Sequence, residues 1–274
     1  MPSFGIAEQV SPIRTRLGEG PRWDAEAGRL LWVDIEGGRL HAGERTVDCG
    51  AMVGAVAPWA GDTVLAALRD ELAAVDVGDG SVRRLAPIPH GRPGMRTNDG
   101  ACDAAGRFWI GTMSLDEAPS AGALYRYDPD GTLRTVLTEI TVSNGLGWDA
   151  EDRLMYYIDS RTQRVDVFDF HAESGELENR RPFASIPAED GIPDGLAVDD
   201  EGGVWVALYG GGRVVRFDPD GAPSGEVGVP VPKVTACCFA GSRMYVTARE
   251  GLFAVDVPYS GPPARPFGGT PRTS

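Results

Sequence analysis

The sequence has no long hydrophobic run and no excess of positive charge. No stretch approaches the roughly 20 apolar residues of a membrane-spanning helix, and residues 1–10 lack the basic start and apolar stretch of a secretion signal. The net charge of −14 and the pI of about 4.6 are opposite to the basic surface that nucleic-acid binding requires. We therefore expect a cytoplasmic protein without a nucleic-acid or membrane partner.

Cysteine and histidine are scarce, and their positions exclude several kinds of site. The cysteines lack the spacing of a disulfide framework, so we expect reduced, buried thiols. The histidines have no i, i+4 or paired spacing, which argues against a histidine-based zinc site. There is also no Gly-x-Ser-x-Gly motif and no Cys–His pairing, so covalent serine or cysteine catalysis has no support. The residues concerned are Cys49, Cys102, Cys237, Cys238, His41, His90 and His171.

Helical periodicity is almost absent as well. Short runs of β-branched and aromatic residues recur instead between glycine, proline and aspartate turns, as in residues 30–35, 122–127 and 214–217. The 37 glycines and 21 prolines are consistent with many turns. A length of 274 residues with 42% hydrophobic content is enough to bury a large core. The sequence therefore predicts an all-β fold.

The β-runs repeat along the chain in six units. The units begin near Gly20, Gly54, Gly100, Gly145, Gly195 and Ala236, mostly about 35–50 residues apart, which is the spacing of propeller blades. We predict a six-bladed β-propeller with four-stranded blades, formed as a single domain over residues 1–274. Residues 235–258 contain one predicted strand fewer than the other units, and residues 7–16 are expected to supply the missing edge strand. Two packed β-sandwiches are the alternative, but they do not explain the repeat, and no linker divides the chain at its midpoint.

In four units an acidic or amide residue stands before the glycine at the same offset. The pairs are Glu19-Gly20, Asp99-Gly100 with Asn98 before it, Asn144-Gly145 and Asp194-Gly195. Asn-Gly and Asp-Gly pairs also form ordinary hairpin turns. The recurrence in phase, ahead of a strand that lines the propeller channel, favours a ligand role over turn chemistry.

Three of these residues offer only oxygen ligands. Glu19, Asn144 and Asp194 suit a hard divalent cation such as Ca²⁺, Mg²⁺ or Mn²⁺. Two carboxylates and one amide are too few to saturate calcium, so positions stay open for water and substrate. Tyr209, followed by glycines 210–212, is a candidate for the channel mouth, although glycines there more often mark a tight bend.

Six motifs extend the pattern of polar pairs along the chain. They are Leu17-Gly-Glu-Gly-Pro21, Arg96-Thr-Asn-Asp-Gly100, Gly106-Arg-Phe-Trp-Ile-Gly-Thr-Met113, Gly122-Ala-Leu-Tyr-Arg126, Ser143-Asn-Gly-Leu146 and Pro193-Asp-Gly-Leu196. By these motifs the sequence resembles the senescence marker protein, gluconolactonase and luciferin-regenerating enzyme family. The motifs follow the order of the family, and the resemblance runs from about Leu17 to Val257, over nearly the whole chain.

The resemblance implies a divalent-metal-dependent lactonase that opens the ring of an aldonolactone, with a small-molecule sugar lactone as its partner. It implies one divalent cation on Glu19, Asn144 and Asp194, with Ca²⁺ expected and Zn²⁺, Mn²⁺, Mg²⁺ or Fe²⁺ as alternatives. It also makes Asp194 the general base, with activation of the water by the cation as the alternative. Arg96 and Asn98 are expected to contact substrate. The chain is expected to be a monomer or a weak homodimer.

Three points stay open at the level of sequence. Asp116 stands where eukaryotic members of the family carry a substrate-contacting glutamate, so the identity of the substrate is in question. Arg96 has an alternative role as a rim arginine paired with surface carboxylates, and Asn98 as the cap of a tight turn. The function itself has two alternatives: a non-catalytic calcium-binding propeller, and a hydrolase of phosphotriesters or other esters in the same channel.

Overall fold

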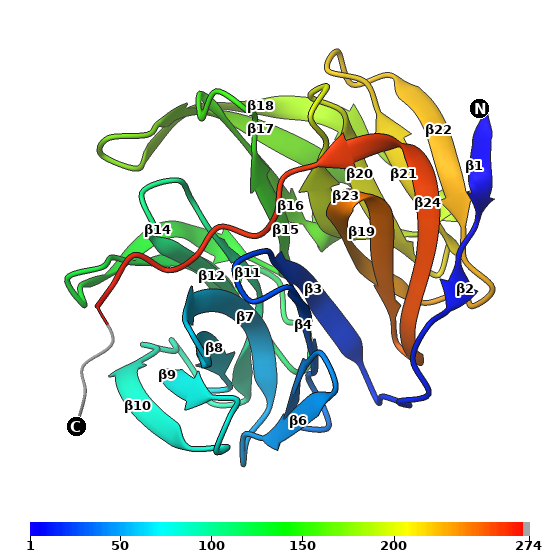
Figure 1. The fold of residues 1–274 in the computed structure, drawn as a ribbon. Helices are drawn as coiled ribbons and strands as arrows, with labels where there is room; N and C mark the ends of the chain where they lie inside the picture. Colours follow the sequence, from blue (N-terminus) through cyan, green and yellow to red (C-terminus); the bar gives the residue numbers. More distant parts are fainter. Residues whose placement is uncertain (271–274) are drawn as a thin grey trace. The chain divides into compact units, whose positions relative to one another are not determined.

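The computed structural model describes residues 1–270, which form six β-sheets and two short 3-10 helices (Figure 1). Each sheet is one blade, and each of the six predicted unit starts lies on the first strand of a blade. The structure therefore confirms the predicted six-bladed β-propeller. Within the described residues, no helix has the length and apolar character needed to span a membrane.

The first three blades each contain four strands in a simple meander. Their strands are β3 (Gly18–Asp24), β4 (Arg29–Asp34), β5 (Arg39–Ala42) and β6 (Arg45–Asp48) in blade one; β7 (Val53–Ala60), β8 (Thr63–Leu68), β9 (Glu71–Asp76) and β10 (Val82–Pro87) in blade two; and β11 (Met95–Cys102), β12 (Phe108–Ser114), β13 (Gly122–Tyr127) and β14 (Leu133–Ile140) in blade three.

Blades four and five continue the same order. Blade four has β15 (Ser143–Trp148), β16 (Leu154–Asp159), the 3-10 helix Ser160–Thr162, β17 (Arg164–His171) and β18 (Glu176–Ser185). After the 3-10 helix Ala188–Asp190, blade five has β19 (Ile192–Val198), β20 (Val204–Tyr209), β21 (Arg213–Phe217) and β22 (Pro223–Gly228).

Blade five also contains a fifth strand that the repeat did not predict. β1 (Ser3–Ile6) pairs in parallel with β22 at its outer edge. The Phe4 ring reaches inward to Trp205 and Tyr259, with centroid distances of 5.6 and 5.4 Å. Gly225 makes room for that ring, since a Cβ there would lie 2.1 Å from it.

Blade six takes its edge strand from the N-terminus, as the sequence predicts. β2 (Glu8–Gln9) pairs with β24 (Gly251–Gly261), which pairs in turn with β23 (Val234–Ala248). β23 doubles back near Gly241, where φ is +65°, a conformation that favours glycine. The hydroxyls of Thr235 and Thr247 lie 3.0 Å apart, so the two halves of β23 lie side by side. The first half is the inner strand of the blade.

The chain divides into two compact units, which we describe separately. The first unit comprises Met1–Pro21 and Asn144–Pro263, and the second comprises Arg22–Ser143 and the segment from Ala264. In both units the core consists of the inward-facing aliphatic and aromatic residues of the strands. Trp32, Trp109 and Trp205 are buried. All four cysteines are free and buried, as predicted, and burial raises the pKa of the Cys49 thiol to about 11.

Two blades contain a buried network of an aspartate, a tryptophan and an arginine, in which the aspartate and the tryptophan occupy equivalent positions. In blade five, Asp199 Oδ2 accepts hydrogen bonds from Trp205 Nε1 at 2.8 Å and Arg216 Nε at 2.7 Å. In blade three, Asp103 Oδ2 accepts hydrogen bonds from Trp109 Nε1 at 2.8 Å and from Arg107 Nε at 2.6 Å. Each aspartate lies six residues before its tryptophan. In each network the aspartate accepts the hydrogen bond of the buried indole N–H and neutralises the charge of a buried guanidinium.

The C-terminal segment crosses the blades of the second unit. Ala264 N donates to Trp23 O, Phe267 N to Pro58 O and Gly268 N to Gly106 O, each at 2.8–2.9 Å. These acceptors belong to blades one, two and three. The segment therefore ties the three blades of this unit together.

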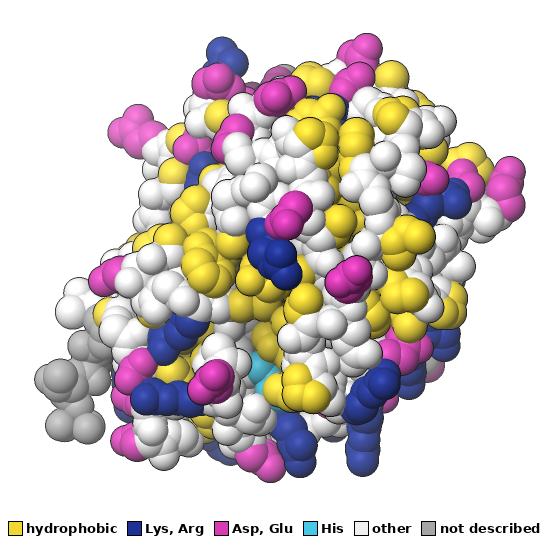
Figure 2. Space-filling model, turned by 45° about the vertical axis from the view of Figure 1, so that its right-hand side comes forward, with side chains coloured by type: hydrophobic (Ala, Val, Ile, Leu, Met, Phe, Trp, Pro, Cys, Tyr) yellow, Lys and Arg dark blue, Asp and Glu magenta, His cyan; other side chains and the backbone are white. Residues whose placement is uncertain are grey.

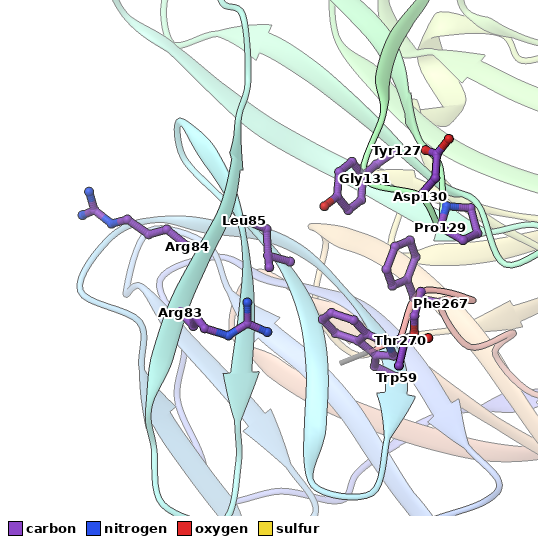
Figure 3. A pocket seen from close by; sticks show the side chains of 11 residues that line it. Trp59, Arg83, Arg84, Leu85, Tyr127, Pro129, Asp130, Gly131, Phe267 and Thr270 are labelled. Carbon is purple, nitrogen blue, oxygen red and sulfur yellow. Dashed lines mark hydrogen bonds between the residues drawn. The ribbon is translucent and has the colours of Figure 1, made fainter. Parts of the chain in front are cut away.

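A cavity of about 360 Å³ lies beside this segment (Figure 3). The buried Phe267 ring contacts Trp59 edge-on at 5.0 Å and stacks on Tyr127 at 5.4 Å. In Figure 3 the Arg83 side chain extends toward Trp59, whereas the neighbouring Arg84 points away. Phe267 therefore forms an aromatic wall of the cavity.

Acidic and basic side chains are interspersed on the face drawn in Figure 2. Within residues 1–270, exposed charged side chains form ion pairs, for example Arg181 with Asp169 at 2.8 Å and Arg92 with Asp116 at 2.9 Å. Single exposed pairs of this kind contribute little to stability. They leave the net charge of −14 unchanged, because the 26 basic residues cannot neutralise all 40 acidic ones.

His41 is expected to make the protein less stable in acid. Its ring stacks on Trp32 at 4.2 Å and is almost fully buried. Burial lowers the pKa of His41 from 6.5 to about 4, partly opposed by the charge of Asp34 and assisted by that of Arg39. Below pH 6.5 the unfolded chain takes up a proton that the folded chain binds only near pH 4. Falling pH therefore favours unfolding, by about 3 kcal/mol between pH 7 and pH 4 for this group.

Urea unfolding at both pH values measures this loss. We expect the loss to be about 3 kcal/mol smaller in His41→Gln than in the wild type. His171→Asn is the matched control, because His171 is exposed and pairs with Glu178. Equal losses in the wild type and in His41→Gln would contradict this account of His41.

Candidate metal and substrate site

A chain of hydrogen bonds links Asn144 to the strand that carries Asp194. Asn144 Nδ2 donates to Ser160 Oγ at 2.8 Å, and Ser160 Oγ donates to Pro193 O at 2.7 Å. Pro193 directly precedes Asp194. The amide nitrogen donates in this contact, and the amide oxygen is the acceptor atom of Asn144 that suits a cation.

Two glycines allow the strands that carry these residues to approach each other. A Cβ on Gly145 would lie 2.8 Å from Asp194 O and 2.5 Å from Leu196 N. A Cβ on Gly195 would lie 2.5 Å from that of Ala236. The glycines of these two polar pairs thus have a packing role, because they lack the side chain that would separate adjacent inner strands.

Thr235 connects this group of strands to Glu19. Its hydroxyl donates to Gly18 O at 2.7 Å, and its carbonyl oxygen lies 2.8 Å from where a Cβ of Gly195 would be. The start of β23 therefore lies between the starts of β3 and β19. Glu19 Oε2 accepts a hydrogen bond from Gly20 N at 2.7 Å. The first unit thus brings together the starts of the strands that carry all three predicted ligands.

The donor set of these three residues fits a divalent cation. Glu19, Asn144 and Asp194 are only 4%, 5% and 8% exposed. Two carboxylates buried in one region favour a compensating positive charge. The described residues contain no group of three or more His, Cys, Asp or Glu side chains able to hold a metal, and the predicted set combines two carboxylates with an amide. Carboxylate and amide oxygens are the ligands that Ca²⁺ and Mg²⁺ use.

In the second unit, Arg96 and Asn98 lie together on β11. Arg96 Nη1 donates to Asn98 Oδ1 at 2.5 Å and to Thr97 O at 3.0 Å. Asn98 Nδ2 donates to Ser143 O at 2.8 Å, so its side chain reaches the next inner strand. Both residues are buried. Substrate contact and the alternative roles of a rim arginine and a turn cap all stay predictions for this pair.

Asp99 has a different role from Asn98. Its Oδ1 accepts from Arg22 Nη2 at 2.9 Å and from Gly100 N at 2.7 Å. The carboxylate of the third polar pair is therefore used in a buried ion pair. In the third unit it is therefore Asn98, directly before the pair, whose side chain contacts Arg96 and the next inner strand.

Asp116 lies on the exposed turn after β12, and its side chain is 60% exposed. Its Oδ2 accepts from Arg92 Nη2 at 2.9 Å. The Ser114 hydroxyl and the Arg92 guanidinium lower the pKa of this carboxyl. Asp116 therefore differs from Arg96 and Asn98, both of which are buried in the sheet.

Sequence reasoning missed Ser160 and Thr235. Ser160 gives no local signal, because its contact with Pro193 spans 33 residues. Thr235 does have a signal, because in the sixth unit it occupies the offset that the polar pairs occupy in the others. Its hydroxyl makes a structural hydrogen bond at this position.

Known proteins resemble the chain over most of its length. A family model described as SMP-30/Gluconolactonase/LRE-like region matches residues 17–250. Regucalcin from Oryctolagus cuniculus is 38% identical over 261 residues, which cover 89% of this chain and 87% of that protein.

Two solved structures give the same result. The calcium-binding protein regucalcin from Agrobacterium tumefaciens has a TM-score of 0.89 at 26% identity, over 97% of this chain and 99% of that one. A gluconolactonase from Xanthomonas campestris has a TM-score of 0.73 at 26% identity, over 89% of this chain and 87% of that one. The chain belongs to the SMP-30/gluconolactonase/LRE-like family.

Proposed function

We propose that this protein is a divalent-metal-dependent lactonase that opens the ring of a sugar lactone. The observation that carries the proposal is the convergence of Glu19, Asn144 and Asp194 at the starts of neighbouring inner strands. Membership of a family that includes a gluconolactonase supports the reaction class. The Agrobacterium relative, described as calcium-binding, supports Ca²⁺ as the cation.

All three residues are proposed to hold the cation, and Asp194 is also proposed to accept a proton. When bound, the cation supplies Lewis acidity that stabilises negative charge on the lactone carbonyl oxygen. The Ser160 hydroxyl holds the amide of Asn144 in one orientation. The Asp194 carboxylate accepts the proton of the attacking water as the water adds to the carbonyl carbon. That proton then moves to the ring oxygen as the C–O bond breaks, which gives a hydroxy acid.

Arg96 and Asn98 are proposed to bind the hydroxyl groups of the sugar. A guanidinium offers several N–H donors, and a primary amide offers both a donor and an acceptor, which suits neighbouring hydroxyls. The contact between Arg96 and Asn98 orients both groups before substrate arrives. Asp116 is a weaker candidate for substrate contact because it is exposed and already paired with Arg92.

Two other functions use the same residues. A cation-binding protein without catalysis is favoured by the description of the Agrobacterium relative as a calcium-binding protein. Hydrolysis of phosphotriesters or other esters needs the same cation and the same base. Both remain alternatives to be separated by experiment.

Acid release measured with a pH indicator separates the three functions. The metal-free protein is mixed with aldonolactones, a phosphotriester or an aryl ester, each with Ca²⁺, Mn²⁺, Mg²⁺, Zn²⁺ or Fe²⁺, and the cation without protein gives the spontaneous rate. The proposal predicts cation-dependent acid release that is fastest with an aldonolactone. Faster turnover of the phosphotriester or ester would favour the second hydrolase, and no acid release above the spontaneous rate in any mixture would favour the binding protein.

A further inference from the structure

The sequence contains a single lysine, Lys233, among 26 basic residues of the Lys and Arg types. It directly precedes β23 in the first unit. Its ammonium nitrogen lies 5.5 Å from the centre of the Tyr209 ring, and the two residues form an antiparallel β-bridge. Lys233 O also accepts a hydrogen bond from Arg249 N at 2.9 Å. Both the backbone and the side chain of this lysine are therefore held in place.

Lys233 lies close to the predicted metal ligands along the strand. Two residues later, Thr235 contacts Gly18 and the position of Gly195, which are the neighbours of Glu19 and Asp194. Two residues of β-strand span about 7 Å. Lys233 thus lies about 7 Å along the strand from the residue that contacts the neighbours of Glu19 and Asp194. Its blade is one of the two that lack a polar pair.

The ammonium group has no acidic partner within residues 1–270. A nearby cation behaves differently: Arg213 pairs with Asp190 and with Glu226. Tyr209 ends β20, and the bend after it contains Gly210 and Gly212 at φ +88° and +63°, so the predicted tight bend is confirmed. In a protein of net charge −14, an ammonium held on an aromatic face and not neutralised by a carboxylate is available to an anionic ligand.

We propose that Lys233, positioned by Tyr209, binds the carboxylate of a sugar acid at the start of β23. This inference rests on the proposed lactonase function and names the charge that the site recognises. A neutral aldonolactone acquires a carboxylate only when its ring opens, whereas the monolactone of a sugar diacid carries one from the start. Lys233 would bind the product in the first case and select the substrate in the second.

Direct binding can be measured because the lysine is unique. Reductive methylation with ¹³C-formaldehyde labels the N-terminus and Lys233, and the signal missing from Lys233→Met identifies that of the lysine. We expect gluconate to shift the Lys233 methyl signal in a saturable way, and sorbitol, its neutral analogue, not to shift it. An unmoved signal at saturating gluconate would overturn the proposal. The readout needs no turnover, so it is independent of whether the protein hydrolyses lactones.

Kinetics then separate the two sources of the carboxylate. In Lys233→Met we expect the inhibition constant of gluconate to rise about tenfold, and Lys233→Arg to restore it to within about threefold. If the carboxylate of the substrate is also recognised, kcat/KM for the monolactone of a sugar diacid falls about tenfold relative to that for a neutral lactone. Lys233 has no role in carboxylate binding if neither quantity changes by more than twofold.

Arg153→Met is the matched control for the loss of one positive charge. Arg153 belongs to the same unit and lies in the turn between β15 and β16, where its side chain is 75% exposed and its partner is Glu151. We expect the inhibition constant of gluconate to stay within twofold of wild type in this variant. An equal effect of both variants would assign the change to net charge and overturn the role of Lys233.

Discussion

Replacing Asp194 with asparagine is expected to lower kcat/KM for lactone hydrolysis about a thousandfold while the fold persists. The substitution removes a proton acceptor, a contribution of typically 10²–10⁴-fold, and one of the two carboxylates proposed to hold the cation. Asparagine has the same size as aspartate, and the strand that carries Asp194, β19, is paired with β20. The measurement is the initial rate of acid release, with circular dichroism as the test of folding.

Asp256→Asn controls for the loss of one negative charge. Asp256 belongs to the same unit, but its side chain is 73% exposed and pairs with Arg243. We expect this variant to keep wild-type activity. A folded Asp194→Asn protein that retains more than a tenth of wild-type kcat/KM would remove Asp194 from the mechanism.

Replacing Asp199 with alanine is expected to lower the free energy of unfolding by about 3–5 kcal/mol. Asp199 is fully buried, and its Oδ2 accepts hydrogen bonds from Trp205 and from Arg216. Without it, the buried guanidinium keeps only the partly exposed Asp218 as a carboxylate partner, and the indole N–H loses its acceptor. Burial of an uncompensated charge and of an unsatisfied donor both favour the unfolded chain.

Urea unfolding of Asp199→Ala and of a nearby control measures this effect. Glu201→Ala is the control, because Glu201 lies two residues away and is exposed. An exposed substitution of this kind changes stability by about 0.5 kcal/mol or less. If Asp199→Ala were no more destabilising than Glu201→Ala, the Asp–Trp–Arg network would not hold the blade together.

The blades were predictable because their signals are local. Alternating apolar residues and turn residues repeat at a constant offset, and the propeller follows from that period. The edge strand of blade six was predictable for a related reason, since residues 235–258 lack one strand of the repeat. Unpaired strand edges are disfavoured, so another segment had to cover this one.

Contacts between distant segments could not be derived in the same way. The parallel pairing of β1 with β22 and the docking of Phe267 on Trp59 and Tyr127 join parts of the chain separated by more than 100 residues. Nothing in the local sequence of either partner specifies the other. Asp199 and Trp205 are an exception, because the six-residue spacing also occurs at Asp103 and Trp109 and could have revealed the network.

In the candidate site, too, local signals were predictable and contacts between distant segments were not. The offset of the polar pairs predicts which strands carry Glu19, Asn144 and Asp194, and the glycine contacts show that these strands approach each other in the first unit. The roles of these residues and of Arg96 and Asn98 stay predictions. Gly145 and Gly195 have a second role that the sequence did not separate from turn formation: they allow the close packing of inner strands.

The dependence of lactone hydrolysis on cation concentration tests the central claim most directly. Metal-free wild-type protein and Asn144→Ala are titrated with the most activating cation while acid release is followed. We predict a rise from the spontaneous rate that fits one site in the wild type, with the half-saturating concentration at least about tenfold higher in Asn144→Ala. Hydrolysis by the metal-free protein at the metal-loaded rate, or identical half-saturation in both proteins, would contradict a cation held by Glu19, Asn144 and Asp194.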